Sequence, residues 1–344
     1  MDEQYMQRCL DLAGLGMGRV APNPMVGSVI VHNDVIIGEG YHRKYGEAHA
    51  EVNAVNAVVR QELLKESTLY VNLEPCAHFG KTPPCSQLII DKGIPKVVIG
   101  TIDPFSRVAG KGIEMLKKAG IDVQLGILEE ESRKLNRRFF TFHQQSRPYI
   151  ILKWAQTKDG FLDKLRSFGS EETAEWITNK TSKALVHKWR ADEAAIMVGT
   201  ITAIKDNPQL NIREWSGSDP LRVVLDRELK LKPDLYLLDG SIPTLVLTEI
   251  SGSASNKIEH FKTEFDSNLL NKLMTELFNR DVQSVIIEGG EVLLNSFIEE
   301  GLWDEARVFT GDRYFGKGVD APVITGNIAS DEFIGNSGLI VYMR

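Results

Sequence analysis

The first part of the chain alternates between apolar positions spaced as in helices and apolar positions spaced as in strands. Residues 5–13 show the helical spacing, and residues 26–31 and 35–38 are predicted to form a hairpin that turns at Asn33-Asp34. Further helices are expected at residues 49–60, 84–92, 110–119 and 129–143, and further strands at residues 68–73, 96–101 and 121–125. Such alternation predicts a mostly parallel sheet covered by helices on both faces.

A short interruption at Ser146-Arg147-Pro148 separates this part from a second alternating pattern. Because proline after a charged helix is typical of a linker, we expect domains at residues 1–146 and 147–344. In the second part, the predicted strands are residues 149–154, 194–198, 221–225, 244–247, 284–287 and 306–310. Helices are expected at residues 181–191, 268–278 and 291–300, the second with an apolar stripe for core packing.

Length and composition fit two ordinary domains. The 344 residues suit two domains of about 150–200 residues each. A hydrophobic fraction of 42% and a charged fraction of 25% are those of a soluble globular protein. The longest apolar stretches are far shorter than a membrane span, and the acidic start of the chain does not look like a signal peptide. We therefore expect a cytoplasmic protein.

The chemistry of the first domain is indicated by one imidazole, two thiols and a carboxylate. His49-Ala50-Glu51, Pro75-Cys76 and Pro83-Pro84-Cys85 supply these groups, with eight residues between the two cysteines. The prolines predict that both thiols lie where helices begin, which favours the metal-binding thiolate. Three protein ligands and a water describe catalytic zinc, which makes hydroxide near neutral pH while Glu51 carries the proton to a leaving amine. The pattern indicates a zinc-dependent base deaminase, whose usual signature is H-x-E and then P-C-x-x-C.

Other uses of these residues remain open at this point. A structural zinc site would need a fourth ligand, for which His42, His78 and Cys9 are the candidates. A non-catalytic protein of this kind would use its second half for binding. A nucleic-acid base deaminase would share the chemistry, but the wide cysteine spacing, the net charge of −7 without basic runs and the long second domain disfavour it.

The sequence around these residues resembles one family closely. Residues 21–27, 49–51 and 74–85 are similar to motifs of the bifunctional riboflavin-biosynthesis enzymes, which join a diaminohydroxyphosphoribosylaminopyrimidine deaminase to a 5-amino-6-(5-phosphoribosylamino)uracil reductase. The match continues through residues 103–104, 108–112, 153, 159–160, 176–178, 206–208 and 288–290. The resemblance implies a cytidine-deaminase-like three-layer α/β domain, followed by a dihydrofolate-reductase-like α/β domain.

In the first domain, the resemblance implies roles that agree with the chemistry above. His49, Cys76 and Cys85 match the zinc ligands, and Glu51 matches the proton shuttle. Positions that hold the pyrimidine and its ribose phosphate correspond to Asn23, His42, Lys81, Thr82 and Asp103. An amide such as that of Asn23 presents both a donor and an acceptor to a base edge, and a lysine supplies positive charge for a phosphate.

In the second domain, the resemblance implies a polar catalytic centre and an NADPH site. Lys153, Asp206 and Glu288 match the centre, in which Asp206 also contacts the cofactor and Glu288 the substrate. The other substrate positions correspond to Ala174, Arg190, Leu210 and Arg213, and the other cofactor positions to Ala155, Trp176, Thr202, Arg227, Gly289 and Gly290. An arginine fork suits a phosphate, and reduction of a sugar carbon needs a hydride that no side chain supplies.

Three positions depart from the family pattern. Phe105 stands where the family usually has a polar side chain, Ala174 where it has a serine, and Arg227 where it has a small hydroxyl residue. The resemblance implies zinc-dependent deamination of 2,5-diamino-6-(5-phosphoribosylamino)pyrimidin-4-one, then NADPH-dependent reduction of its ribosyl group to ribityl. A deaminase with a weak or inactive reductase half is the alternative. The resemblance also implies a homodimer formed through the reductase domain, without nucleic-acid or membrane partners.

Overall fold

The computed structural model describes residues 1–77, 83–105, 109–166, 175–252, 255 and 257–344. These residues form two compact units, unit 1 (Met1–Ser146) and unit 2 (Arg147–Arg344). Each unit has its own sheet and its own apolar core. Among the described residues, no helix is both long enough and apolar enough to cross a membrane.

Unit 1 is built on a five-stranded sheet in the order β2-β1-β3-β4-β5. Its strands are β1 (Gly27–His32), β2 (Val35–Tyr41), β3 (Thr68–Leu73), β4 (Lys96–Thr101) and β5 (Asp122–Leu125). The predicted hairpin is confirmed, with Asn33 and Asp34 at positive φ in its turn. The expectation of a mostly parallel sheet is wrong here, because a two-residue turn joins only antiparallel strands and β1 also pairs antiparallel with β3. The β3–β4 and β4–β5 pairs are parallel.

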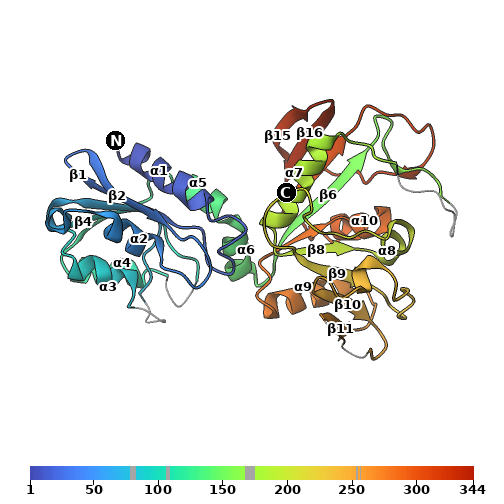
Figure 1. Cartoon of the computed structure of the whole chain (residues 1–344), viewed down its shortest axis with the longest axis horizontal. Coiled ribbons are helices and arrows are strands. Elements are labelled where there is room, and N and C mark those ends of the chain that lie inside the picture. Colours follow the sequence, from blue (N-terminus) through green and yellow to red (C-terminus); the bar gives the residue numbers. More distant parts are fainter. Residues whose placement is uncertain (78–82, 106–108, 167–174, 253–254, 256) are drawn as a thin grey trace. The chain divides into compact units, whose positions relative to one another are not determined.

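Helices cover both faces of this sheet (Figure 1). Val29 of β1 points to the face covered by α1 (Asp2–Gly14), whereas its neighbour Ile30 points to the opposite face. That opposite core is completed by α2 (Ala50–Ala57), α3 (Cys85–Asp91), α4 (Lys111–Lys118) and the 3-10 helix η1 (Gln61–Glu66). Unit 1 is thus a three-layer arrangement in which α2, α3 and α4 share one side of the sheet.

The single helix expected at residues 129–143 is wrong, since it is divided into α5 (Glu129–Leu135) and α6 (Arg137–Gln145). The division falls at the buried Asn136. Its side-chain amide donates to the Met25 carbonyl and accepts from the Met25 N–H, both at 2.8 Å. The spacing of apolar residues predicts one continuous helix through Asn136, but this residue bonds to the Met25 backbone of another segment, and the helix is interrupted there.

Unit 2 is built on a nine-stranded sheet in the order β11-β10-β9-β8-β12-β6-β13-β16-β15. All neighbours from β11 to β13 are parallel, whereas β16 and β15 add antiparallel pairs at one edge. The strands are β6 (Tyr149–Gln156), β8 (Ala195–Val198), β9 (Leu221–Leu225), β10 (Thr244–Thr248), β11 (Ile258–Lys262), β12 (Ser284–Ile287), β13 (Glu305–Thr310), β15 (Asn327–Ile334) and β16 (Ser337–Met343). A small ribbon pairs β7 (Phe161–Asp163) with β14 (Val319–Asp320).

Helices again cover both faces of the sheet. One core contains α9 (Leu269–Asn279) and α10 (Glu291–Glu299), and the predicted apolar stripe of α9 is confirmed as part of it. The opposite cores contain α7 (Lys180–Asp192), α8 (Thr200–Asp206) and the short η2 (Tyr236–Leu238). The helix α8 and the strands β11, β15 and β16 were not predicted. β15 is mostly exposed at a sheet edge, where no buried face imposes an alternating pattern.

Candidate active sites

Unit 1 brings one imidazole and two thiols together. His49 is the N-cap residue of α2, Cys85 is the first residue of α3, and Cys76 lies in the segment after β3. The His49 Nδ1 atom is 3.4 Å from the Cys85 Sγ atom and 3.6 Å from the Cys76 Sγ atom. All three ligand atoms lie within 4.8 Å of one another. One nitrogen and two sulfurs at this spacing fit a single zinc ion with a further position for water.

The expectation that Cys76 opens a helix is wrong, because residues 74–77 are not helical. The start of α3 nevertheless reaches this thiol, since the Cys85 N–H donates to the Cys76 Sγ atom at 3.3 Å. Of the proposed fourth ligands, neither Cys9 nor His42 belongs to the group of ligand atoms within the described residues. Cys9 packs in the core between α1 and the sheet, and His78 lies outside the described residues.

Hydrogen bonds within this group favour a proton on Cys85 and on His49 and a thiolate at Cys76. The Cys85 thiol donates to Cys76 and, with the nearby His49, lowers the pKa of Cys76 to about 4. The same contact and burial raise the pKa of Cys85. Interaction with Cys76 raises the pKa of His49 to about 9. Since zinc binds thiolates and neutral imidazole, metal binding must release the protons that Cys85 and His49 otherwise hold.

Glu51 lies beside the metal-ligand group, in the first turn of α2. Only 3% of the residue is exposed, and this burial raises the pKa of its carboxyl group. Its carboxyl group also interacts with the Cys85 side chain. A carboxyl group with a raised pKa next to metal ligands is suited to taking up and delivering a proton near neutral pH.

Asn23 and His42 meet next to the same group. The Asn23 Nδ2 atom donates to the His42 Nε2 atom at 3.1 Å, and the His42 Nδ1 atom is 3.1 Å from the Ala48 carbonyl oxygen. The His42 ring lies edge-on to His49, with ring centroids 5.5 Å apart. Burial lowers the pKa of His42, so the ring stays neutral and donates through its Nδ1 atom.

Two buried asparagines that sequence reasoning missed hold the backbone of the loop between Asn23 and Gly27. Besides Asn136, Asn72 of β3 accepts from the Gly27 N–H at 2.8 Å and donates to the Met25 carbonyl at 3.1 Å. Both amides therefore fix the backbone that follows Asn23. A buried amide within an apolar strand was the available signal, because such a group requires partners.

Asp103 follows β4 and is 8% exposed. Its Oδ1 atom accepts from the Phe105 N–H at 2.8 Å, and burial raises the pKa of the carboxyl group to about 6. The Phe105 ring packs beside α6, 4.9 Å from the His143 ring. Thus the side chain that departs from the family pattern joins an apolar cluster with Leu73 and Phe139, while its backbone supports Asp103. Lys81 and Thr82 lie outside the described residues.

Unit 2 gathers two cations around one buried carboxylate. Glu288 directly follows β12 and accepts from the Arg190 Nε and Nη2 atoms at 3.1 and 2.7 Å. The Lys153 Nζ atom of the neighbouring strand β6 is 3.9 Å away. Burial alone would raise the pKa of Glu288, but Arg190 and Lys153 together lower it to about 2. Burial in turn lowers the pKa of Lys153.

The third member of the expected centre belongs to a different ion pair. Asp206 is the last residue of the helix α8. Within the described residues, its ion-pair partner is Arg166, whose Nη2 atom is 2.5 Å from both Asp206 and Asp163. The helix α8 was not predicted because it is too short for a helical spacing of apolar residues to be recognised.

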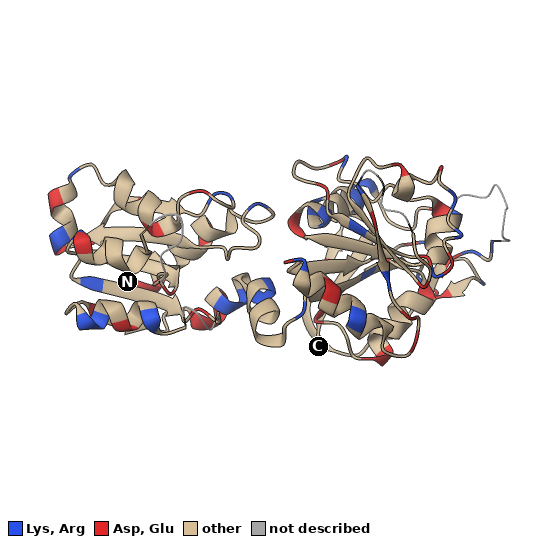
Figure 2. Cartoon of the chain, turned by 90° about the horizontal axis from the view of Figure 1, so that it is seen from below, with Lys and Arg blue, Asp and Glu red and all other residues tan. Residues whose placement is uncertain are grey.

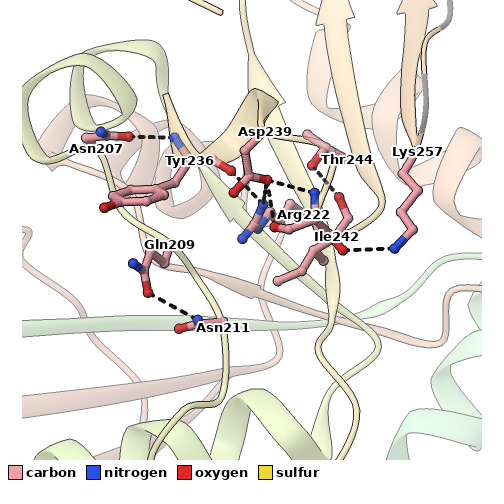
Figure 3. A network of polar contacts seen from close by, with 10 residues as sticks. Asn207, Gln209, Asn211, Arg222, Tyr236, Asp239, Ile242, Thr244 and Lys257 are labelled. Atoms are coloured by element: carbon pink, nitrogen blue, oxygen red, sulfur yellow. Dashed lines mark hydrogen bonds and ion pairs between the residues drawn. The ribbon is translucent and has the colours of Figure 1, made fainter. Parts of the chain in front are cut away.

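The segment after α8 links Asp206 to the Arg190 group. Arg190 and Arg213 converge on Asn211, because Arg190 donates to its carbonyl at 3.2 Å and Arg213 to its side chain at 2.7 Å. Asn211 also donates to Gln209 at 3.1 Å (Figure 3). Leu210 between them is 3% exposed, and its side chain lies in the core that includes α8.

A second network, which sequence reasoning missed, anchors the same segment (Figure 3). The Asn207 Oδ1 atom accepts from the Tyr236 N–H at 2.8 Å, while the fully buried Arg222 donates to the Tyr236 carbonyl at 2.7 Å. Both backbone polar groups of Tyr236 are thereby held, and the bond to Asn207 fixes the residue next to Asp206. A fully buried arginine in a strand is itself a signal, since it must find acceptors.

The expected cofactor residues lie at the ends of several elements. Gly290 is the N-cap residue of α10, and a Cβ atom there would lie 3.3 Å from the Thr202 Oγ1 atom of α8. Trp176 is exposed, with the Lys183 Nζ atom 5.0 Å from its ring centroid, and the exposed Arg227 pairs with Glu249 at 2.8 Å. Ala155 lies on β6, Gly289 precedes Gly290, and Ala174 is outside the described residues.

The family described as "Cytidine and deoxycytidylate deaminase zinc-binding region" matches residues 1–101, and "RibD C-terminal domain" matches residues 148–334. "Riboflavin biosynthesis protein RibD" of Aquifex aeolicus is 41% identical over 325 residues, which cover 93% of this chain and 89% of the relative. The protein of the same name from Escherichia coli strain K12 is 34% identical, with 92% and 89% covered.

Two solved structures are similar over their whole length. One is a diaminohydroxyphosphoribosylaminopyrimidine deaminase/5-amino-6-(5-phosphoribosylamino)uracil reductase from Thermotoga maritima, with a TM-score of 0.90 and 36% identity, covering 99% of this chain and 98% of the other. The other is Acinetobacter baumannii RibD, with a TM-score of 0.89, 32% identity and the same coverage. These matches confirm the expected fold class, a cytidine-deaminase-like domain followed by a reductase domain.

Proposed function

The chain belongs to the RibD family of bifunctional riboflavin-biosynthesis enzymes, and from that premise we propose how its residues divide the two reactions. Unit 1 carries out the zinc-dependent hydrolytic deamination of 2,5-diamino-6-(5-phosphoribosylamino)pyrimidin-4-one. Unit 2 then reduces the ribosyl group to the ribityl chain with NADPH. The single observation that carries the assignment is the group of His49, Cys76 and Cys85, whose ligand atoms lie within 4.8 Å of one another beside the buried Glu51.

In unit 1, His49, Cys76 and Cys85 would hold the zinc ion. When bound, zinc lowers the pKa of a water molecule and so supplies a nucleophile near neutral pH. Glu51 takes the proton of that water and delivers it to the departing amine. Asn23 offers a donor and an acceptor to the pyrimidine edge, and the neutral His42 fixes its amide at 3.1 Å. We assign Lys81, Thr82 and Asp103 to the phosphoribosyl group.

In unit 2, we assign Arg190 and Arg213 to the phosphate of the deaminated intermediate. Lys153 donates a hydrogen bond or a proton to the ribose, since its ammonium lies beside Glu288 and burial lowers its pKa. Glu288 holds both Arg190 and Lys153 and contacts the substrate. We also assign Leu210 and Ala174 to the binding of the substrate.

NADPH supplies the hydride for this reduction. We assign Asp206 and Thr202 of α8, Gly289 and Gly290 before α10, and Ala155, Trp176 and Arg227 to its binding. The support is that Gly290 is the N-cap residue of α10 and lies close to Thr202, since a Cβ atom there would be 3.3 Å from the Thr202 Oγ1 atom. The first N–H groups of a helix lack intrahelical partners and favour a phosphate.

The direct test is incubation of the full chain with the diaminopyrimidine substrate, with and without NADPH, and analysis of the products by mass. We expect ammonia release in both cases, and the ribityl product only with NADPH. Treatment with a zinc chelator should stop ammonia release and leave reduction of the supplied deaminated intermediate. Continued ammonia release by protein that metal analysis shows to be free of zinc after chelation would contradict the zinc assignment. Accumulation of the ribosyl intermediate in the presence of NADPH would favour the weak-reductase alternative.

We further propose that the protein acts as a homodimer through unit 2 and works in the cytoplasm without nucleic-acid partners. The edge strand β15 exposes Ile328 and Phe333, the latter to 78%, as suits a second copy. Lys and Arg are interspersed with Asp and Glu over both units (Figure 2), which does not suit a nucleic-acid backbone. Sedimentation of wild type and Phe333→Ser checks the dimer, and an unchanged molecular mass in the variant would contradict this edge.

A further inference from the structure

One buried carboxylate in unit 1 has no role in the reaction as assigned above. Glu74 directly follows β3, two residues before the metal ligand Cys76, and is 4% exposed. Its Oε2 atom accepts from the N–H groups of Asp103 at 3.3 Å and Gly110 at 2.9 Å. Its Oε1 atom accepts from those of Gly112 at 2.9 Å and Ile113 at 3.3 Å. A single side chain thus binds four backbone donors.

These donors belong to the other elements that surround the site. Asp103 follows β4, Gly110 is the N-cap residue of α4, and Gly112 and Ile113 lie in its first turn. The first N–H groups of a helix lack intrahelical partners and form its positive end, which favours a carboxylate there. The carboxylate comes from a different strand, so it ties the start of α4 and the segment after β4 to the segment that carries Cys76.

A close backbone approach at Gly112 supports the same connection independently. A Cβ atom on Gly112 would collide with the carbonyl oxygen of Pro75. The first turn of α4 therefore packs directly on the peptide that leads into Cys76. On its other side, Cys76 is held by α3, because the Ser86 Oγ and N–H groups donate to its carbonyl at 2.7 and 3.2 Å.

We propose that Glu74 is a positioning residue of the deaminase, which sets the distance between the metal ligand Cys76 and the substrate residue Asp103. The inference rests on the proposed function, since it takes Asp103 to face the substrate. A glutamine at this position presents one N–H₂ group to backbone N–H donors and loses half of the acceptors. The segments after β3 and β4 then separate, and both the metal geometry and the binding of the phosphoribosyl substrate change.

The test uses the full chain with Glu74→Gln, Glu74→Asp and Gly112→Ala, and with Glu39→Gln as the control. Glu39 is a partly exposed glutamate of the same unit that pairs with Arg8 at 2.7 Å. Cobalt(II) replaces zinc, because its absorption bands report the geometry of the thiolate ligands. Deamination and reduction of the supplied intermediate are measured separately, so that unit 2 serves as an internal check on the preparation.

We expect Glu74→Gln to shift the cobalt bands and to lower kcat/KM for deamination by about 10–100-fold, mainly through KM, as is typical of groups that orient metal ligands. Reduction should be unchanged in every variant. Glu74→Asp keeps the charge and should lose less, whereas Gly112→Ala should resemble Glu74→Gln. Glu39→Gln should match wild type. Loss of cobalt from a folded Glu74→Gln would also support the proposal, because Cys76 is then displaced.

Unchanged cobalt bands together with an unchanged deaminase KM in a folded Glu74→Gln would overturn the proposal. So would a lower melting temperature as the only effect, since that is what a purely structural carboxylate gives. If Glu74→Gln does not fold, Glu74→Asp and Gly112→Ala decide in the same way. If the wild-type protein binds cobalt without releasing ammonia, the proposed function fails. The positioning role of Glu74 is then tested by the cobalt bands alone, compared between Glu74→Gln and wild type.

Discussion

Two buried glutamates illustrate how surroundings assign different tasks to one residue type. Burial raises the pKa of Glu51, which has no salt-bridge partner among the described residues. Glu288 is also buried, but the charges of Arg190 and Lys153 lower its pKa to about 2. A carboxyl group that exchanges a proton near neutral pH suits hydrolysis, whereas a permanent carboxylate suits the orientation of cations.

We predict that Glu51→Gln retains zinc and loses ammonia release. The amide cannot transfer the proton, and such transfer contributes about 10²–10⁴-fold to a rate. Zinc content by atomic absorption and ammonia release decide the matter, with Glu66→Gln as an exposed control on η1. A zinc-free but folded Glu51→Gln would make the carboxylate a ligand and exclude the shuttle role.

We predict that Glu288 makes the stability of unit 2 depend on acid pH. Its folded-state pKa of about 2 is below the usual 4.5, so the unfolded chain binds the proton more readily. The contribution is therefore fully present above pH 4.5 and is lost as the pH falls toward 2. Urea unfolding followed by tryptophan fluorescence reports unit 2 alone, because all five tryptophans lie in it.

In Glu288→Gln, the free energy of unfolding should change less between these pH values than in wild type. The variant should also be less stable at neutral pH, because Arg190 and Lys153 lose their buried partner. Parallel pH profiles for the two proteins would show that Glu288 is not the titrating group. The same variant should stop NADPH oxidation while ammonia release continues, since the two sites lie on separate units.

At the scale of elements, close backbone packing positions the active-site loops. In unit 1, β1 lies against α1 at Gly27, where a Cβ atom would collide with the Cys9 carbonyl oxygen and come within 2.9 Å of the Ala13 N atom. The Gly27 N–H is held by Asn72 at 2.8 Å. Since Gly27 ends the loop that begins at Asn23, this contact connects the core of the unit to the loop that we propose faces the substrate.

We predict that Gly27→Ala destabilises unit 1 by about 1–3 kcal/mol, as expected when a methyl group is forced into a packed interface. Gly14→Ala is the matched control, because Gly14 ends α1 and a Cβ atom there would meet nothing within 4 Å. Its stability should be unchanged or slightly higher. Far-ultraviolet circular dichroism reports the loss of unit 1, and tryptophan fluorescence should show unit 2 unaffected. Equal stability of both variants would contradict the close packing.

At the scale of the whole molecule, the two proposed sites use separate sheets and separate cores. The metal-ligand group lies entirely in Met1–Ser146, and the Glu288 group lies entirely in Arg147–Arg344. The division into a deaminase domain at residues 1–146 and a reductase domain at residues 147–344 stays a prediction until each part is produced alone. Two chemistries on one chain then need no shared residue.

We predict that residues 147–344, expressed alone, fold and bind NADPH. Their tryptophans should report binding through a change in fluorescence, and residues 1–146 should show no NADPH binding. The intact chain provides the reference affinity. A folded fragment that does not bind NADPH, beside an intact chain that does, would count against this boundary or require a contribution from unit 1.

The sequence by itself determined the buried strands and the ligand types. β3, β4, β9 and β12 were predicted with the bounds that the structure shows, because runs of apolar residues bounded by polar ones report burial directly. The candidate zinc ligands were also readable, since imidazole and thiol groups with a nearby carboxylate are informative by residue type alone, and the structure brings these three side chains together. Information of this kind depends on the residue types themselves, so it can be read without knowing which residues meet in the folded protein.

Only the tertiary structure decided which polar groups meet. Glu74 binds N–H groups 36 and 38 positions further along the chain, Asn136 gives up helical continuity for a residue 111 positions away, and Asp206 pairs with Arg166 apart from Glu288. The spacing of apolar residues reports which face of an element is buried but not which partner a buried polar group finds. That choice follows from how the layers pack, because each buried donor or acceptor must be satisfied wherever the fold places it.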